Sequence, residues 1–246
     1  MNNNIVKFIF GVFLALQCNI IQAALPDQAA PKKNKKMNIV VILADDLGFS
    51  DIQSYGSEIS TPNIDKLAQQ GLRFSNYHTA ASCAPTIAML LTGVDSHRAG
   101  VANIAEALTD AQAGSPFYRG TLNKNVVTLA SLLKNQGYHT YMAGKWHLGH
   151  KNPELRPINR GFEQTVMMPY SGADNWQQKS YLPNYSEVDW FANGKKITLP
   201  EDFYSSKYII DNTIKFIDSN KSDDQPFFSY VAFQAVHTER IYRQIP

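Results

Sequence analysis

The apolar residues of the chain gather in short continuous runs that alternate with longer amphipathic stretches. Continuous runs rich in β-branched and aromatic residues predict buried strands, and they cover residues 38–44, 138–143 and 226–233. Amphipathic or capped stretches predict helices, and they cover residues 61–71, 85–92, 128–136 and 204–220. Strands that alternate with helices are typical of a parallel sheet covered by helices on both faces. The pattern therefore predicts an α/β fold.

Two further segments have weaker patterns. Residues 72–77 fit a short strand. Residues 168–200 are rich in Tyr, Trp, Asn and Pro, and they predict a long loop excursion outside the sheet. Long loops in compact domains are usually functional or mobile, so we expect this one to shape the substrate pocket.

The first 37 residues differ in character from the rest of the chain. A lysine, an apolar run over residues 8–16 and small residues at positions 23 and 24 are typical of a secretory signal peptide over residues 1–24. Polar residues from position 17 end the run well short of the ~20 that cross a bilayer, so we expect no stable membrane span. Residues 25–37 predict a flexible tether. We therefore expect an exported, periplasmic or secreted protein with one domain over residues 38–246.

The charge balance excludes a basic surface for nucleic acid. The chain has 23 Lys and Arg against 21 Asp and Glu, a formal net charge of +2 at pH 7. Five lysines lie in the N-terminal segments: Lys7, Lys32, Lys33, Lys35 and Lys36. Without those five the chain is mildly acidic, so we expect no nucleic-acid partner.

Polar side chains with catalytic potential follow each of the three predicted strands. Asp45 and Asp46 follow the first, Lys145 and His147 follow the second, and His237 follows the third. Ligands of open parallel sheets bind outside the carboxyl ends of the strands, so these side chains should converge. Each one alone is more often a capping or surface residue. Together they predict a site for a metal and an anion.

Cys83 is a second chemical candidate. The only other cysteine, Cys18, lies in the predicted signal peptide, so the exported chain has no internal disulfide. Cys83 lies at the expected N-terminus of the helix over residues 85–92, where N–H groups and the helix dipole lower the pKa of a thiol. A buried, inert cysteine is the commoner alternative. The position favours a reactive Cys83.

Four sequence blocks, taken together in their order and spacing, are specific enough to indicate a family. They are NIVVILADDLGFSD (38–51), TPNIDKLAQQG (61–71), HTAASCAPTIAMLLTGVDSHRAG (78–100) and YHTYMAGKWHLG (138–149), with a looser fifth at 226–237. Together they resemble the sulfatase family of the alkaline phosphatase superfamily, most closely the bacterial arylsulfatases. The resemblance implies an alkaline-phosphatase-like α/β fold with a parallel-rich sheet between helices. It covers only the N-terminal half of the family's catalytic domain, and we expect a chain truncated at its C-terminus.

The resemblance also implies an activity, the hydrolysis of sulfate esters. The cysteine matching Cys83 is oxidised in sulfatases to formylglycine, whose hydrated aldehyde is the nucleophile. Lys145 matches the lysine that bridges nucleophile and sulfate, and His147 matches the histidine that helps deprotonate the nucleophile. His237 matches the histidine near the leaving-group oxygen. The implied partners are a small sulfate ester or a sulfated sugar, and a formylglycine-generating enzyme.

The implied cofactor is Ca²⁺. Asp45 and Asp46 match calcium ligands together with the residue at position 83, and hard carboxylate oxygens suit this cation. The family's remaining calcium ligands and a second lysine have no match in this chain. Ile87 also replaces the arginine of the Cys-x-Pro-x-Arg signature that the formylglycine-generating enzyme reads. We therefore expect Cys83 to stay largely unconverted and the chain to have little activity as it stands.

Two other functions stay open. One is a phosphate or phosphonate ester hydrolase of the same superfamily, although Asp45, Asp46 and the block around Cys83 favour sulfate. The other is a non-catalytic remnant that binds anions without turnover, which Ile87 and the unmatched second half favour.

Overall fold

The computed structural model describes residues 35–180 and 185–237 of the 246-residue chain. The chain divides into two units, residues 1–36 and 37–246. The predicted signal peptide and most of the predicted tether lie outside the described residues. Within the described ranges, no helix combines the length and apolar character that crossing a bilayer requires.

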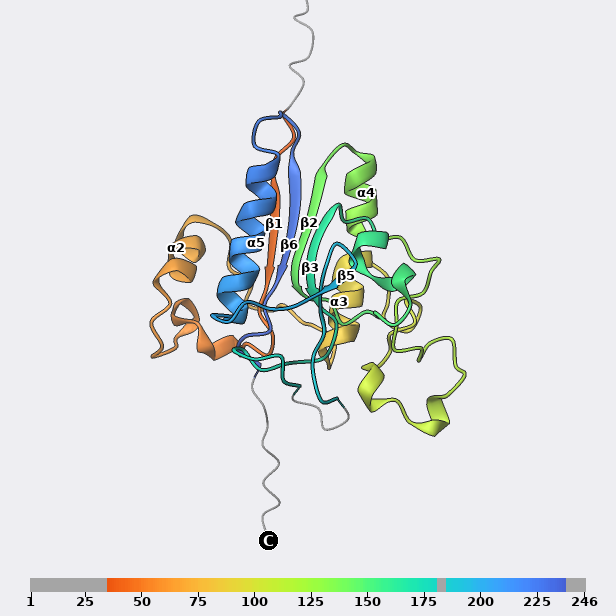
Figure 1. Cartoon of the computed structure of the whole chain (residues 1–246). Helices are drawn as coiled ribbons and strands as arrows, with labels where there is room; N and C mark the ends of the chain where they lie inside the picture. The colour runs from red at the N-terminus through yellow and green to blue at the C-terminus, as the bar shows by residue number, and fades with distance from the viewer. Residues whose placement is uncertain (1–34, 181–184, 238–246) are drawn as a thin grey trace, which may run out of the picture. The chain divides into compact units, whose positions relative to one another are not determined.

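A six-stranded sheet forms the centre of the second unit (Figure 1). Its strands are β1 (Ile39–Leu43), β2 (His139–Lys145), β3 (Gln164–Met168), β4 (Trp190–Ala192), β5 (Lys195–Ile197) and β6 (Phe227–Ala232). The spatial order is β1-β6-β2-β3-β4-β5. The first four strands in this order are parallel, and β4 and β5 add an antiparallel hairpin. The mostly parallel sheet confirms the predicted α/β class.

Helices cover both faces of this sheet. The α-helices are α2 (Pro62–Gln70), α3 (Cys83–Thr92), α4 (Leu129–Asn135) and α5 (Ser205–Ser219). Short 3₁₀ helices cover Phe49–Asp51, Gln53–Tyr55, Ala105–Ala107, Asp110–Gln112, Pro153–Leu155 and Pro157–Asn159. α5 lies on one face against β2 and β6, and α3 and α4 lie on the other (Figure 1). The predicted sheet between helices is therefore confirmed.

Each face of the sheet has its own apolar core. The core beneath α3 and α4 includes Trp146, whose ring meets Phe162 edge to face with centroids 6.2 Å apart. The indole N–H of Trp146 donates to the Leu155 carbonyl at 2.9 Å, so its one polar atom is paired. The core beneath α5 is centred on Trp190 and Tyr141. These two cores hold the middle of the sheet rigidly between its helices.

The ends of the predicted elements are close to those observed. α2 begins after Thr61 with a proline in its first turn and ends at Gly71. α3 begins earlier than predicted, at Cys83, which places the cysteine in the first turn of the helix. β2 extends beyond the predicted end at residue 143 and includes Lys145.

The predictions for two weakly patterned segments are wrong. Residues 72–77 form no strand, because exposed side chains such as Leu72, at 87% exposure, meet no neighbouring strand there. Residues 168–200 contain the hairpin of β4 and β5 instead of lying wholly outside the sheet. The hairpin turns at Asn193 and Gly194, whose φ values are +47° and +80°. Asn-Gly is a strong hairpin signal, but the strands beside it are only three residues long.

The prediction of a buried strand over residues 38–44 is also wrong for one face of that strand. β1 lies at the edge of the sheet, and α5 packs on its inner neighbours β6 and β2. Val40 and Ile42 are therefore 51% and 59% exposed, whereas the alternate residues of β1 face the core. A continuous apolar run cannot reveal how many of its faces are covered.

Candidate active site

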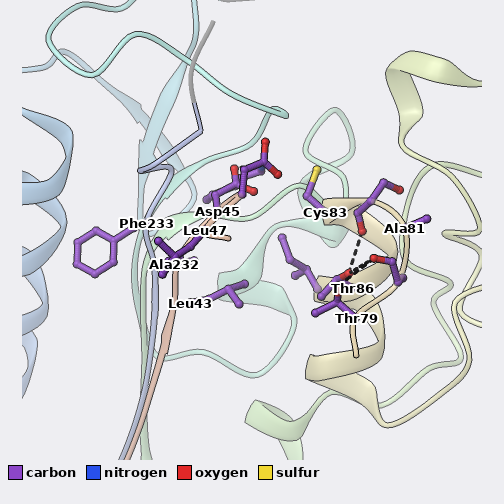
Figure 2. A pocket seen from close by; sticks show the side chains of 15 residues that line it. Leu43, Asp45, Leu47, Thr79, Ala81, Cys83, Thr86, Ala232 and Phe233 are labelled. Atoms are coloured by element: carbon purple, nitrogen blue, oxygen red, sulfur yellow. Dashed lines mark hydrogen bonds and ion pairs between the residues drawn. The ribbon is translucent and has the colours of Figure 1, made fainter. Parts of the chain in front are cut away.

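A pocket of about 230 Å³ lies at the carboxyl ends of β1, β2 and β6. Segments far apart in the sequence line it: the residues after β1, the end of β2, the end of β6, and the first turn of α3. Asp45, Asp46, Cys83 and Lys145 are among its lining residues. Figure 2 shows Cys83 and Asp45 on facing sides of this pocket. The structure thus brings these predicted site residues together at one sheet edge.

Backbone pairing that continues beyond the strands positions Asp45. The N–H of Phe233 donates to the Leu43 carbonyl at 2.9 Å, and the N–H of Asp45 donates to the Ala235 carbonyl at 3.0 Å. Lys145 ends β2 on the other side of β6 and is 2% exposed. Its Nζ donates to Asp45 Oδ2 at 2.5 Å. The buried ammonium is therefore paired with a carboxylate, as a charge at this depth requires.

His237 lies close to Asp46, which lines the pocket. Its Nε2 lies 3.7 Å from Asp46 Oδ2, and the Asp46 side chain is mostly exposed at the pocket rim. The Asp46 backbone is left-handed, with φ of +57°. Non-glycine residues adopt that conformation at a cost, and such residues gather at functional sites.

Cys83 contacts His147 directly. Its Sγ lies 3.3 Å from His147 Nδ1, and a longer contact of 4.0 Å joins Sγ to Ser171 Oγ. His147 is 3% exposed, and its other ring nitrogen, Nε2, lies 3.1 Å from Glu106 Oε2. The His147 backbone is also left-handed, with φ of +52°. The result is a buried chain of contacts from Cys83 through His147 to Glu106.

The contacts among Cys83, His147 and Glu106 shift the pKa of each group toward its charged form. Burial raises the pKa of the Cys83 thiol, but the hydrogen bond and charge of His147 and the charge of Lys145 outweigh it, so the pKa lies below its ordinary value. Burial lowers the pKa of His147, whereas its contacts with Cys83 and Glu106 raise it above the ordinary value. Burial raises the pKa of Glu106, and the hydrogen bond with His147 brings it below the ordinary value.

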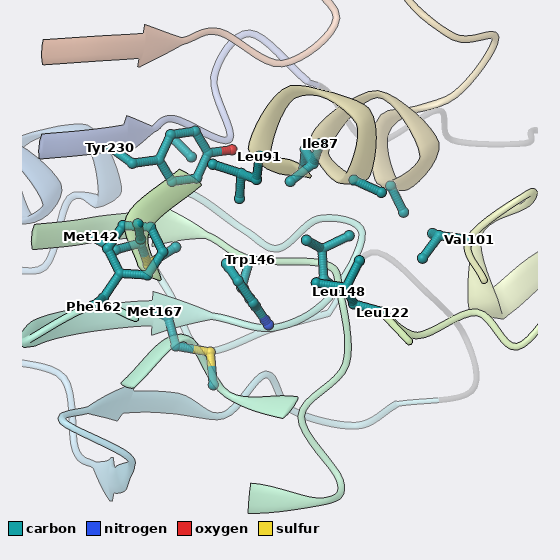
Figure 3. Close-up of a cluster of buried hydrophobic side chains, with 14 of the residues drawn as sticks. Ile87, Leu91, Val101, Leu122, Met142, Trp146, Leu148, Phe162, Met167 and Tyr230 are labelled. Carbon is teal, nitrogen blue, oxygen red and sulfur yellow. The ribbon is translucent and has the colours of Figure 1, made fainter. Parts of the chain in front are cut away.

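Ile87 occupies the position of the arginine expected from the family signature. Its side chain is 2% exposed, and Figure 3 shows it on the core side of α3 near Leu91 and Tyr230. It also lines the pocket next to Cys83. The Ile87 side chain is apolar and therefore donates no hydrogen bond to residue 83.

The predicted calcium site is only partly present. Asp45 and Asp46 provide hard oxygen donors beside the pocket, which suits Ca²⁺ in chemical type. However, the described residues contain no group of three or more His, Cys, Asp or Glu side chains able to hold a metal ion. Calcium takes six to eight oxygen ligands, so these two carboxylates fit the cation without completing its shell.

Glu106 and Ser171 belong to this site, although neither was predicted from the sequence. Glu106 lies in a short 3₁₀ helix, 41 residues before its partner His147. Ser171 lies in the segment that was assigned to a loop excursion. No local pattern relates either residue to the four blocks, so only the folded chain shows their proximity to Cys83.

Comparison with known proteins finds sulfatases at the level of both family and individual relatives. The sulfatase family model matches residues 37–244. An arylsulfatase of Klebsiella aerogenes is 35% identical over 219 residues, which is 88% of this chain and 46% of the relative. An uncharacterised sulfatase of Schizosaccharomyces pombe is 38% identical over 222 residues, which is 83% of this chain and 38% of the relative. The chain thus spans less than half the length of these relatives.

Solved structures share the fold as well. A structure of Ps i-CgsB in complex with k-i-k-neocarrahexaose has a TM-score of 0.69 and 30% identity, covering 82% of this chain and 46% of that chain. A structure of BT4656 in complex with its substrate, D-glucosamine-2-N,6-O-disulfate, has a TM-score of 0.63 and 28% identity, covering 82% and 35%. The resemblance inferred from the four sequence blocks is confirmed.

Proposed function

Because the chain belongs to the sulfatase family, we propose that its pocket binds the sulfate group of a sulfate ester and carries the nucleophile of a sulfuric ester hydrolase. One observation carries this proposal: Cys83 contacts His147 in a pocket that Lys145 also lines. A nucleophile, a base and a buried cation are the groups that transfer of an anionic sulfuryl group needs.

The proposed substrate class is an aryl sulfate or a sulfated sugar. An arylsulfatase stands among the relatives, and the substrate of BT4656 is a sulfated glucosamine. Lys145 and the positive end of the ten-residue helix α3 attract the sulfate oxygens. The apolar wall at Ile87 faces the same space. The finer choice between aryl and sugar esters depends on groups beyond this pocket.

Position 83, His147, Lys145 and His237 each have a proposed role in turnover. When position 83 is converted to formylglycine, it supplies a hydrated aldehyde whose hydroxyl attacks sulfur. His147 Nδ1 faces position 83 and accepts the proton of the attacking group. Lys145 counters negative charge on the transferred group. His237, close to Asp46, donates a proton to the ester oxygen as the bond from that oxygen to sulfur breaks. The second hydroxyl of the hydrate then loses its proton and expels the sulfate, which restores the aldehyde.

Calcium binding is part of the proposal and is expected to be weak. Asp45 and Asp46, with position 83, would hold Ca²⁺, which would supply positive charge beside the sulfate oxygens. Two carboxylates leave most ligand positions to water, so we expect a dissociation constant in the range of about 10⁻⁴–10⁻³ M or weaker. Titration calorimetry checks this, with Asp46→Asn expected to abolish the signal. Tight, stoichiometric binding by the parent chain would contradict it.

The test of the function uses the chain produced together with a formylglycine-generating enzyme. We expect 4-nitrophenyl sulfate to be hydrolysed in proportion to the converted fraction of residue 83, measured by mass spectrometry. His147→Asn should reduce the rate per converted molecule by about 100-fold or more while leaving the fold intact. Faster hydrolysis of 4-nitrophenyl phosphate or of a phosphonate ester by the same samples would overturn the assignment to sulfate.

A non-catalytic anion-binding protein is the second candidate, and Ile87 favours it. An aliphatic side chain in place of the signature arginine disfavours conversion of Cys83. In that case unconverted protein binds the aryl sulfate, calorimetry detects the binding, and no product forms.

A further inference from the structure

Glu106 has no role in the proposed reaction, yet its carboxylate is largely buried within the site. Its side chain is 11% exposed, and Oε2 lies 3.1 Å from Nε2 of His147. A carboxylate that has lost most of its water must be compensated by hydrogen bonds or by a positive charge. Here a histidine that itself contacts position 83 provides the compensation.

The Glu106 carboxylate is itself held in place. The backbones of Glu106 and Ser171 also contribute to lowering the pKa of this carboxylate. Glu106 thereby joins three segments that meet at the pocket: its own 3₁₀ helix, the turn after β2 that carries His147, and the turn after β3 that carries Ser171. Because this carboxylate is largely buried where the three segments meet, it is an anchor for the imidazole.

The imidazole ring needs such an anchor because a turn about its own axis would change which nitrogen faces Cys83. His147 has φ of +52°, and its ring has two possible orientations that exchange the nitrogen facing Cys83. Since carboxylates only accept hydrogen bonds, Nε2 must carry the hydrogen that points at Glu106. In the neutral ring this leaves the lone pair on Nδ1, directed at position 83 across 3.3 Å.

We propose that Glu106 is a positioning residue, which accepts the Nε2–H of His147 and so keeps Nδ1 directed at the nucleophile of residue 83. The catalytic importance of Glu106 rests on the proposed function. The contacts from Glu106 through His147 to Cys83, however, are present in the unconverted chain. The alternative is a purely structural ion pair that ties the 3₁₀ helix to β2 without affecting residue 83.

Reactivity of the unconverted thiol distinguishes the two alternatives. The measurement is the rate of alkylation of Cys83 by iodoacetamide in the folded chain at pH 7, followed by peptide mass spectrometry. Glu106→Leu should slow alkylation about tenfold. The His147 imidazole, once released from Glu106, no longer keeps its contact with the Cys83 thiol. Glu106→Gln should retain most of the rate, since its amide oxygen still accepts from Nε2–H. Glu154→Leu, at an exposed glutamate paired with Lys124, is the matched control and should leave the rate unchanged.

A double-mutant cycle on the alkylation rate separates the positioning role from a purely structural one. His147→Asn should slow alkylation as much as Glu106→Leu does, and combining the two should cause no further loss, because Glu106 acts only through His147. Equal effects of Glu106→Leu in both backgrounds would overturn the proposal. A folded Glu106→Leu variant that keeps the parent's rate would also overturn it. Where Glu106→Leu fails to fold, a Glu106→Gln rate as low as that of His147→Asn would overturn it instead.

Failure of the proposed function is separable from failure of this inference. Absence of sulfate ester hydrolysis by converted protein would leave the alkylation cycle unchanged. Loss of the coupling between Glu106 and His147, with hydrolysis intact, would remove the positioning role alone.

Discussion

At the scale of single residues, the state of Cys83 decides what the site can do. Ile87 lies beside it in the pocket and donates no hydrogen bond to an aldehyde or to its hydrate. We therefore expect purified protein to carry mostly unmodified thiol at position 83, with negligible turnover of sulfate esters. Mass spectrometry of the peptide over residues 80–89 measures this directly. Abundant aldehyde in the unmutated chain would show that the arginine is dispensable here.

Replacing Ile87 by arginine tests whether the missing guanidinium limits the conversion of Cys83. Ile87→Arg should increase conversion when a formylglycine-generating enzyme is present. It should also lower the free energy of unfolding by about 2–4 kcal/mol, because the side chain enters a buried apolar wall. Met89→Arg is the matched control on the more exposed side of α3, and it should affect neither conversion nor stability strongly.

At the scale of secondary structure elements, Gly144 allows the site end of β2 to pack against β6. Its φ is +112°, and a Cβ at this position would lie 1.8 Å from the Ala232 carbonyl oxygen. Gly144→Ala should therefore force the two strands apart just before Lys145 and lower the free energy of unfolding by about 3–5 kcal/mol. Gly114→Ala is the control, because φ is +78° there but no atom lies within 4 Å, and it should cost about 1–2 kcal/mol. Chemical denaturation compares the two, and equal losses would mean that the contact with β6 is unimportant.

At the scale of the whole molecule, a charged cluster joins distant segments at the opposite end of the sheet from the pocket. His139 at the start of β2 lies 3.0 Å from Glu163, which precedes β3, and 2.9 Å from Asp223, which precedes β6. Lys134 lies 3.7 Å from the same glutamate. Burial lowers the pKa of His139, but the two carboxylates outweigh this and raise it above the ordinary value. A raised folded-state pKa stabilises the fold below the unfolded value of about 6.5, and this gain is lost as pH rises through the folded value.

His139→Gln should therefore cost about 1 kcal/mol near pH 6 and progressively less as pH rises above 7. The measurement is the free energy of unfolding from pH 5.5 to 8.5 for the parent and the variant. His97→Gln, at a more exposed histidine outside this cluster, is the control variant. A pH-independent difference between the parent and His139→Gln would refute the charged-state explanation.

The sequence predicts the parts of the site that follow strands and fails for the parts that depend on remote packing. Asp45 and Lys145 follow from the rule that the carboxyl ends of parallel strands share an edge. Glu106 does not, since its partner lies 41 residues away and no spacing rule relates them. The hairpin of β4 and β5 was missed because strands of three residues show no clear periodicity. The exposure of β1 was missed because a strand's sequence does not record its neighbours.

That exposure of β1 bears on how the protein behaves at high concentration. Among the described strands, β1 pairs only with β6, so its other edge presents N–H and carbonyl groups along an apolar run, with Val40 and Ile42 open to solvent on one face. Such an edge is a template on which another extended chain can add by hydrogen bonding. Self-association on warming should therefore start at residues 39–43, through intermolecular β-structure that infrared spectroscopy detects. A lysine in place of Val40 should delay aggregation without disturbing the pocket.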